Sequence, residues 1–394
     1  MRIALCSDVY APHVGGTEGV MLALCKEYIN KGHSVAVFTQ DRMCDNSAYD
    51  CKQVYPIYRT KSYKLPFYPM CPYPKTDRNF KKRMIDFCPD IIHSHTPFEI
   101  GRWASCVAKE LSIPSVLTTH TYLSYINNQN APFSPANPLH KILAYIPSIY
   151  PKHTSALYTV NTGVSEYVLK KEVRELYKVS TPVVLIKNGY DRKELLFDPI
   201  EYYKQNHSKS KLSLLFVGRI VKEKNICFSF AVCKKLKERG VPFSFRLIGD
   251  GDIPYFKNVA NKLGISDSVE FTGLKEKEEI SRLYASEDVL LFPSEFDADS
   301  LAVKESLACG LIVLAVNGSG TAEQIENGIN GYALEKSDTL FADKTEQLYR
   351  MKTKSFESFL KMREGARNYP IPSWSEIAHE YINLYTKLIN KEQL

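Results

Sequence analysis

The chain has 394 residues, a formal net charge of +7, an apolar fraction of 44% and a charged fraction of 24%. This composition is typical of a globular protein, and the length is too great for one ordinary core, which predicts two domains. The ten cysteines form no CxxC pair and no run approaches 18 apolar residues, which argues against a disulfide framework and against a membrane-spanning helix.

The first half of the chain predicts alternating strands and helices. Residues 2–6 are expected to form a strand, and because this apolar run is too short for a signal peptide, we expect a cytoplasmic protein. An amphipathic helix is expected over residues 17–30 and a second strand over 34–38. Further strands are expected over residues 91–93, 115–119, 157–160 and 183–186.

Gly15 and Gly16 lie between the first strand and its helix. Glycines allow the backbone to approach a phosphate, and the helix that follows offers free N–H groups at its positive end. The segment reads GGTEG and lacks the GxGxxG pattern, so a dinucleotide-dependent enzyme is disfavoured. A tight turn without a ligand is the alternative.

Residues 59–83 combine basic and aromatic side chains. The cations are Lys61, Lys64, Lys75, Arg78, Lys81, Lys82 and Arg83, and the rings include Tyr63, Phe67, Tyr68, Tyr73 and Phe80. Such a mixture suits an anionic membrane surface. The alternative is a solvated loop and helix face with some core aromatics. The chain has no nucleic-acid-binding signature, so we expect no nucleic acid partner.

The nine histidines suggest no metal site. His93, His95 and His120 are the only set close to such a pattern, and no Cys or Asp accompanies them at metal-ligand spacing. We therefore expect no bound metal.

The third quarter of the chain carries the strongest signal. After a polar stretch, Arg192–Lys211, that reads as a linker, a new strand–helix series begins at Leu212. Its apolar runs end in glycines or charged loops, as in a parallel sheet whose strand ends form a ligand crevice. The residues at those ends suit a diphosphate joined to a sugar; they are Gly218, Arg219, Lys224, Gly249, Glu305, Gly318 and Gly320.

Several segments together resemble glycosyltransferase family 4. In chain order they are APHVGGTEGV, IIHSHTPFEIG, TTHTYLSY, GVSEYV, IKNGYD and VGRIVKEKN. The resemblance implies an α/β GT-B fold, with two Rossmann-like domains facing each other across a cleft. Residues 1–191 would bind the acceptor and residues 212–370 the nucleotide sugar. The last helix, about 374–394, would pack back on the first domain.

The resemblance also implies a site. His120 would lie near the sugar, and Arg219 and Lys224 would hold the donor diphosphate as fixed cations in place of a metal. These three are the expected catalytic residues, with no cofactor. The expected donor-binding residues are Gly15, Gly16, Arg219, Lys224, Asp297, Ser300, Leu301 and Glu305.

The segment Asp297-Ala-Asp299 resembles a DxD metal motif, but it follows a predicted strand at residues 289–292 and occupies the place of the family's Glu-x7-Glu element. Glu305 would then lie at a helix start and bind the donor ribose. Asp297 replaces the usual Glu, and Asp299-Ser300 replaces the usual Phe-Gly. These departures resemble the glucosyl-diacylglycerol synthase subgroup, as does a GSxxAE segment in which Ser319, Thr321 and Glu323 have either a binding or a capping role.

The expected function is a metal-independent, retaining transfer of a hexose, most simply glucose from UDP-glucose, to an acceptor hydroxyl. A membrane lipid such as diacylglycerol is the first acceptor expectation, which would place the protein peripherally on the inner face of the cell membrane. A soluble sugar or polysaccharide intermediate is the second. A catalytically inactive GT-B binding subunit is the alternative outside enzymes. An epimerase is disfavoured because VGRIVKEKN and Glu305 resemble the transferase set, and a pyridoxal-type phosphorylase because the motif of its Schiff-base lysine is not found.

Overall fold

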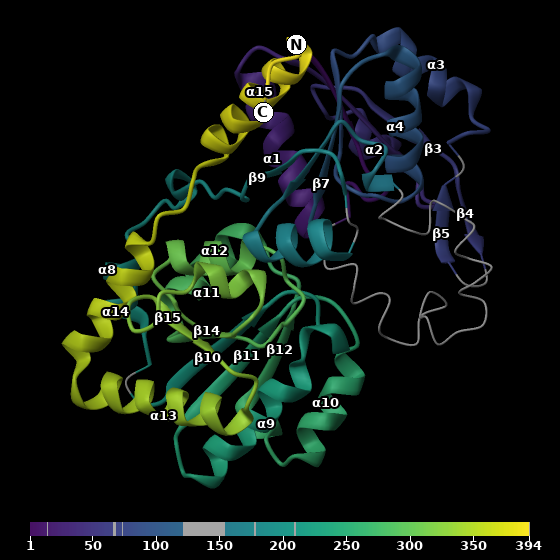
Figure 1. Ribbon diagram of the computed structural model, residues 1–394. Coiled ribbons are helices and arrows are strands. Elements are labelled where there is room, and N and C mark those ends of the chain that lie inside the picture. Colours follow the sequence, from purple (N-terminus) through teal and green to yellow (C-terminus); the bar gives the residue numbers. More distant parts are fainter. Residues whose placement is uncertain are drawn as a thin grey trace. The chain divides into compact units, whose positions relative to one another are not determined.

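The computed structural model describes residues 1–13, 15–65, 68–72, 74–120, 154–176, 179–208 and 210–393. The chain forms two compact units, one of Met1–Gly189 with Ser373–Leu394 and one of Tyr190–Pro372. Each unit is a parallel sheet with helices packed against it (Figure 1). The expected α/β architecture with two Rossmann-like domains is confirmed.

The first unit contains a seven-stranded sheet in the order β3-β2-β1-β6-β7-β8-β9, in which all paired strands are parallel. The strands are β1 (Arg2–Cys6), β2 (Ser34–Gln40), β3 (Ile57–Thr60), β6 (Ile91–Ser94), β7 (Ser115–Thr119), β8 (Val160–Gly163) and β9 (Val183–Leu185). An antiparallel pair, β4 (Ser62–Leu65) and β5 (Tyr68–Pro72), lies outside this sheet. The strand expected over residues 157–160 begins only at Val160, because residues 156–159 form a turn and bend before it.

The helices of the first unit cover the sheet. They are α1 (Gly16–Asn30), α2 (Ser47–Asp50), α3 (Arg78–Phe87), α4 (Glu99–Leu111), a π-helical segment (Val168–Leu176) and α15 (Trp374–Ile389). Phe80 of α3 and Trp103 of α4 pack against Phe38 of β2, with ring centroids 5.5 and 6.2 Å from that of Phe38. Phe80 is therefore a core residue and does not belong to the exposed basic and aromatic surface that was expected of residues 59–83.

Helix α15 joins the end of the chain to the first unit. It begins with a capping box, in which Ser373 and Glu376 accept hydrogen bonds from each other's backbone N–H groups. It lies beside α1 (Figure 1), and Tyr385 of α15 hydrogen-bonds Tyr28 of α1 at 2.9 Å between hydroxyls. The buried positions of α15 recur at helical spacing, as its sequence predicts.

The second unit contains a six-stranded sheet in the order β12-β11-β10-β13-β14-β15, again entirely parallel. The strands are β10 (Leu212–Val217), β11 (Phe243–Ile248), β12 (Val269–Gly273), β13 (Val289–Phe292), β14 (Ile312–Val316) and β15 (Gly331–Leu334). This is the strand order of a dinucleotide-type Rossmann sheet, with β10 as its first strand. The central strands β10, β13 and β14 are short, apolar and buried, as parallel strands usually are, whereas the edge strands β12 and β15 are only partly buried.

Helices cover both faces of this sheet. Figure 1 shows α9 (Ile226–Glu238), α10 (Ile253–Lys262) and α13 (Asp338–Lys354) on one face. On the other face lie α11 (Lys277–Ser286), α12 (Leu301–Ala308) and α14 (Phe356–Asn368).

The polar stretch Arg192–Lys211 is not the linker that its composition suggested. It contains a short 3-10 helix (Arg192–Glu194) and α8 (Pro199–Asn206), and Tyr203 of α8 is fully buried in the core of the second unit. Asp198 caps α8 by accepting hydrogen bonds from the N–H groups of Ile200 and Glu201. The charged residues that suggested a linker form the cap and the exposed face of a packed helix.

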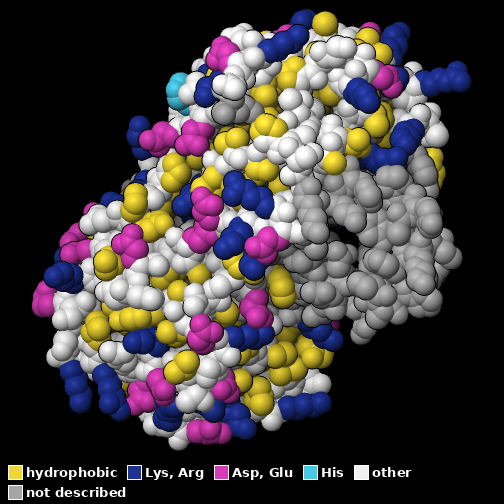
Figure 2. Space-filling model, viewed as in Figure 1, with side chains coloured by type: hydrophobic (Ala, Val, Ile, Leu, Met, Phe, Trp, Pro, Cys, Tyr) yellow, Lys and Arg dark blue, Asp and Glu magenta, His cyan; other side chains and the backbone are white. Residues whose placement is uncertain are grey.

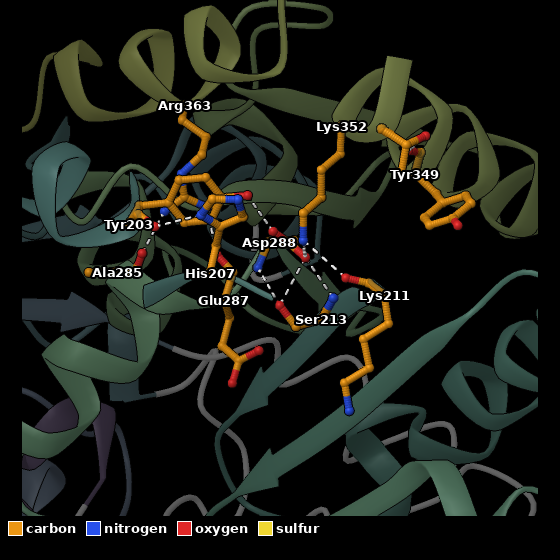
Figure 3. A network of polar contacts seen from close by, with 11 residues as sticks. Tyr203, His207, Lys211, Ser213, Ala285, Glu287, Asp288, Tyr349, Lys352 and Arg363 are labelled. Carbon is orange, nitrogen blue, oxygen red and sulfur yellow. Dashed lines mark hydrogen bonds and ion pairs between the residues drawn. The ribbon is translucent and has the colours of Figure 1, made fainter. Parts of the chain in front are cut away.

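A buried polar network holds the amino-terminal ends of β10 and β13 together (Figure 3). Asp288, just before β13, accepts hydrogen bonds from Ser213 (2.7 Å from the backbone nitrogen), Tyr203 (2.5 Å) and Lys352 of α13 (2.5 Å). Arg363 of α14 stacks on the Tyr203 ring and donates to two backbone carbonyls before β13. Asp288 forms an ion pair with Lys352, whereas the buried Nε of Arg363 has no hydrogen-bond partner in the described chain. The network ties α8, α13 and α14 to the end of the sheet opposite to the carboxyl ends of the strands.

On the face shown in Figure 2, acidic and basic side chains are interspersed over the second unit. Within the described ranges, none of the helices is both long enough and apolar enough to cross a bilayer.

Candidate nucleotide-sugar site

In the strand order of the second unit, the topological switch point lies between β10 and β13, where ligands bind in open α/β sheets. The chain leaves β10 toward β11 on one side and returns to β13 on the other, so the loops after these two strands diverge. Arg219 and Lys224 follow β10, and Asp297, Ser300 and Leu301 follow β13. Residues up to 82 positions apart in the sequence, Arg219 and Leu301, are thus brought to one edge of one sheet.

Two glycines let the loops after β10 and β11 run against each other. Gly218 and Gly249 have φ values of +147° and +143°, and a Cβ on Gly249 would lie 2.0 Å from the carbonyl oxygen of Gly218. Any side chain at position 249 would push the two loops apart. Their close approach sets the course of the backbone that carries Arg219.

Lys224 is held in place by Asp297. The Lys224 Nζ atom lies 2.6 and 2.7 Å from the two carboxylate oxygens of Asp297, and both side chains are largely buried. Arg219, by contrast, is exposed, and no carboxylate in the described part of the chain pairs with it. At this edge of the sheet, Lys224 is therefore a fixed cation paired with Asp297, whereas Arg219 is available to bind an anion.

Asn225 is a site residue that the sequence analysis did not single out. It has a left-handed backbone conformation with φ of +54°, between the 3-10 helix Lys222–Lys224 and α9. Its side-chain amide donates to the Pro293 carbonyl at 3.1 Å and to Glu295 at 2.9 Å, and Glu295 also pairs with Lys336. Asn225 thus ties the loop after β10 to the loop after β13, and its place at the end of VGRIVKEKN was the available signal.

The two carboxylates of Asp297-Ala-Asp299 have different lysine partners. Asp297 pairs with Lys224, whereas Asp299 forms an ion pair of 2.8 Å with Lys304 of α12, with only 3% of each side chain exposed. A metal-binding DxD pair would direct both carboxylates at one cation. Here each carboxylate is already neutralised by an ammonium group, which supports the reading of this segment as part of the Glu-x7-Glu element.

Glu305 lies in the second turn of α12 and not at the helix start that its spacing suggested. Burial raises the pKa of its carboxyl to about 7, against the opposing effects of Lys277 and of the Tyr284 hydroxyl. The Tyr284 hydroxyl donates to Glu305 Oε2 at 3.3 Å. Glu305 is thus a partly exposed carboxylate with one protein donor and remaining capacity to accept hydrogen bonds.

Ser300 and Leu301 begin α12. Ser300 is the N-cap residue, and its side chain makes no capping hydrogen bond in the described structure. The first N–H groups of α12 therefore remain available at the positive end of the helix. Ser319, in turn, caps the 3-10 helix Gly320–Gln324, and the Thr321 backbone N–H donates to the Asp297 carbonyl at 3.2 Å. The structure gives Ser319 its capping role and gives Thr321 a role in holding Asp297.

The remaining predicted residues belong to the first unit. Gly16 is the first residue of α1, and a Cβ added to it would have no neighbour within 4 Å. A Cβ on Gly15 would meet only the end of the Glu18 side chain. Internal packing therefore does not explain Gly16, which leaves its backbone open to a ligand at the start of α1.

His120 follows β7 and contacts a second histidine. Its Nε2 atom lies 2.8 Å from Nδ1 of His95, which follows the neighbouring strand β6. Burial lowers the pKa of His120 to about 4 and lowers that of His95 well below its usual value. His95 was considered with His93 and His120 only as a metal set and rejected as such, although adjacent parallel strands bring the residues after them together. The rest of TTHTYLSY lies outside the described residues.

The basic segment is only partly available as a surface. Lys81 pairs with Glu110 at 2.5 Å, and the exposed Arg83 lies over the Tyr58 ring. The other exposed cations are Lys61, Lys75, Arg78 and Lys82. Tyr63 is 52% exposed. Phe67 and Tyr73 lie outside the described residues, as do the side chains of Lys64 and Tyr68.

Comparison with known proteins agrees with this geometry. The chain matches the family described as Glycosyltransferase Family 4 over residues 14–194 and that described as Glycosyl transferases group 1 over residues 200–369. It is 29% identical over 331 residues to an alpha-monoglucosyldiacylglycerol synthase of Streptococcus pneumoniae, covering 80% of this chain and 71% of that protein. It is 24% identical to the alpha-monoglucosyldiacylglycerol synthase of Acholeplasma laidlawii, covering 86% of each.

A solved structure shares the fold over nearly the whole chain. The Anabaena protein HepE, in complex with UDP-glucose, aligns with a TM-score of 0.71 at 15% identity, covering 98% of this chain and 100% of that one. The two family matches adjoin each other and together span both Rossmann-like units. The chain therefore belongs to the family 4 glycosyltransferases and is a hexosyltransferase of GT-B fold.

Proposed function

We propose that the protein transfers glucose from UDP-glucose to a hydroxyl group of a membrane lipid, such as diacylglycerol, with retention of the anomeric configuration. The observation that carries the donor part is the pair of cations after β10, with Lys224 fixed by Asp297 and Arg219 open. The two relatives named alpha-monoglucosyldiacylglycerol synthase support the acceptor, and the complex of HepE with UDP-glucose supports the donor.

The chemistry follows from where charge develops. As the bond between the sugar C1 and the diphosphate oxygen breaks, its electron pair leaves with the diphosphate, which gains negative charge. Arg219 and Lys224 stabilise that charge. Lys224 is already fixed by Asp297 and needs no rearrangement during the reaction, whereas the exposed Arg219 is free to contact the diphosphate. The N–H groups at the start of α12 lie after β13 at the same edge of the sheet and add a positive dipole.

The acceptor hydroxyl then attacks C1 from the face that the diphosphate leaves. Its oxygen forms the new bond, and its proton passes to the departing phosphate oxygen, so the atoms balance without a protein nucleophile. Glu305 accepts hydrogen bonds from the donor ribose hydroxyls, for which its partly exposed carboxylate is suited. No metal is required, because Lys224 and Lys304 already neutralise Asp297 and Asp299.

A transfer assay tests this proposal. The purified protein is incubated with UDP-glucose, UDP-galactose or GDP-mannose, and with vesicles containing diacylglycerol or with soluble sugars, in excess EDTA. We expect a glucosylated lipid with an α linkage, formed from UDP-glucose and unaffected by the chelator.

Three outcomes of this assay would each contradict a different part of the proposed function. Transfer only to a soluble sugar would reject the lipid acceptor, and loss of activity in EDTA that manganese restores would reject the reading of Asp297 and Asp299. Binding of nucleotide sugars without hydrolysis or transfer would indicate an inactive binding subunit.

A further inference from the structure

Three histidines, the buried His93 and His95 and the partly exposed His120, lie in a row at the carboxyl ends of β6 and β7. The ring centroids of His93 and His95 are 4.1 Å apart, and those of His95 and His120 are 5.1 Å apart. His95 Nδ1 lies 2.8 Å from His120 Nε2, within hydrogen-bonding distance. The proposed catalytic residue His120 is therefore the last member of a row of imidazoles that begins in the core.

The hydrogen bond between His95 and His120 carries a single proton. Burial lowers the pKa of both rings, so both are neutral near pH 7. A neutral imidazole has one N–H group and one lone pair. The position of the shared proton therefore fixes the tautomers of both residues.

The other nitrogen of His95 decides which tautomer forms. His95 Nε2 is buried and has no hydrogen-bond partner in the described chain. Both nitrogens of His93 are already engaged, Nδ1 with the Tyr385 hydroxyl and Nε2 with the Thr118 hydroxyl, each at 2.6 Å. His93 therefore offers nothing to His95 Nε2.

The two arrangements differ in what they leave unpaired. If His120 donated through Nε2, the proton of His95 would sit on Nε2 as a buried N–H group without an acceptor. On the protein backbone, such orphaned donors are rarer than unpaired acceptors, and we apply the same preference to the imidazole. The favoured arrangement has His95 donating through Nδ1–H, His120 accepting at Nε2, and the proton of His120 on Nδ1.

We propose that His95 is a positioning residue that holds His120 in the Nδ1–H tautomer. His120 then offers an N–H group to an oxygen atom of the bound sugar or acceptor and acts as a hydrogen-bond donor, not as a general base. This inference rests on the proposed function for its link to catalysis. It agrees with a reaction in which the departing phosphate, and not a side chain, takes the acceptor proton.

Tautomers are measured directly by NMR. Long-range ¹H–¹⁵N correlation spectra of the ¹⁵N-labelled protein at pH 8 distinguish the Nδ1–H form from the Nε2–H form without any turnover. His207 is an internal reference, because its Nδ1 lies 2.9 Å from the Tyr203 carbonyl oxygen and must carry a proton there. We expect His95 and His120 to show the His207 pattern, and an Nε2–H pattern for His120 would overturn the proposal.

Two substitutions test the link to activity. His95→Asn places an amide N–H close to the position of Nδ1, whereas His95→Leu removes the donor. We expect His95→Leu to lower kcat on the order of tenfold, with little change in the KM for the donor, and to release His120 to the Nε2–H form. His95→Asn should keep most of kcat and the Nδ1–H form of His120.

Equal losses of kcat in the two variants, or an unchanged His120 tautomer in a folded His95→Leu protein, would overturn the positioning role. Should either variant fail to fold, the spectrum of the unaltered protein still decides the tautomer. An inactive unaltered protein with the expected spectrum would refute the proposed function and leave the tautomer assignment standing.

Discussion

Single residues determine what can bind at the carboxyl ends of the strands in each unit. Asp297 is the clearest case, because its carboxylate holds Lys224 with two hydrogen bonds and its carbonyl accepts from Thr321. An Asp has a shorter reach than the Glu usual in the family, so its direct contact with Lys224 fixes this cation close to the backbone after β13. The role of Asp297 is in this way visible in the structure, whereas the sequence showed only its departure from the family pattern.

The affinity for the donor should depend on pH through Glu305. Because the pKa of its carboxyl is raised to about 7, this group becomes protonated as the pH falls through 7, and a protonated carboxyl accepts fewer hydrogen bonds from ribose. We expect the Kd for UDP to rise as the pH falls from 8 to 6, measured by calorimetry. A 2′-deoxy nucleotide should show a smaller pH dependence.

The raised pKa of Glu305 also affects stability. Stability should fall as the pH rises, whereas donor affinity should fall as the pH is lowered. A carboxyl whose pKa is raised in the folded state binds protons there that the unfolded chain has lost, so stability falls as the pH rises from about 4.5 to about 7. Glu305→Gln should therefore raise the Tm of the ligand-free protein at pH 8 more than at pH 5. An equal effect at both pH values would mean that Glu305 titrates in its ordinary range.

A substitution at Gly16 tests whether this glycine is needed for the fold or for ligand binding. Because a Cβ at this position meets nothing, Gly16→Ala should leave the Tm unchanged or raise it slightly, as Ala is favoured over Gly in helices. If a donor phosphate approaches the start of α1, the added methyl group should weaken UDP-glucose binding on the order of tenfold. The variant Thr17→Ala, one residue along, is the control. Unchanged affinity in Gly16→Ala would mean that the glycine pair forms only a turn.

At the scale of secondary structure, the existence of the strands could be predicted from the sequence more reliably than their ends or the segments that connect them. The strands Arg2–Cys6, Ser115–Thr119 and Val289–Phe292 occur at the expected residues, because each is a short segment of mainly apolar or β-branched residues that is almost entirely buried. Residues 192–211 were misassigned, since polar residues dominate the composition of the stretch while Pro199, Ile200 and Tyr203 of α8 are buried. Periodicity over one short helix is too brief to reveal such packing.

The capping box of α15 provides a test at the same scale. Ser373→Ala removes the hydroxyl that accepts from the Glu376 N–H group, and should lower the free energy of unfolding by about 1 kcal/mol. Ser355→Ala is the matched control, because Ser355 is also an N-cap residue but makes no side-chain capping bond. Urea denaturation of both variants measures the difference, and equal losses would show that the capping box contributes nothing of its own.

At the scale of the whole molecule, the sheet order explains why the site could be anticipated and its partners could not. Residues after successive parallel strands converge on one edge, so Arg219, Lys224 and Asp297 were predictable as a group. Their pairing was not, because the sequence does not show that Asp297 takes Lys224 while Asp299 takes Lys304. Likewise His120 was predicted as a site residue, but the hydrogen bond that joins it to His95 emerged only from the pairing of β6 with β7.

A lipid acceptor requires the whole protein to reach a membrane surface. We expect the protein to cosediment with anionic vesicles at low salt and to be released as ionic strength rises, because screening shortens the range of the exposed cations. Replacing Lys75, Arg78 and Lys82 with Glu should abolish this binding. The same charge change at Lys257, Lys262 and Lys354, which are exposed in the second unit, should not. If the two triple variants lost vesicle binding to a similar extent, the binding would depend on the net charge of the protein and not on residues 59–83.

In the proposed reaction, Arg219 and Lys224 hold the departing diphosphate. The direct measurement is single-turnover transfer of glucose from UDP-glucose by Arg219→Ala and Lys224→Ala, with Lys222→Ala as a neighbouring control whose ammonium lies over the Tyr255 ring. Since fixed charges at a leaving group contribute several kcal/mol, we predict a loss of about 10²-fold or more in each of the two site variants, and little change in the control. Near-normal turnover of folded Arg219→Ala and Lys224→Ala proteins would contradict the account.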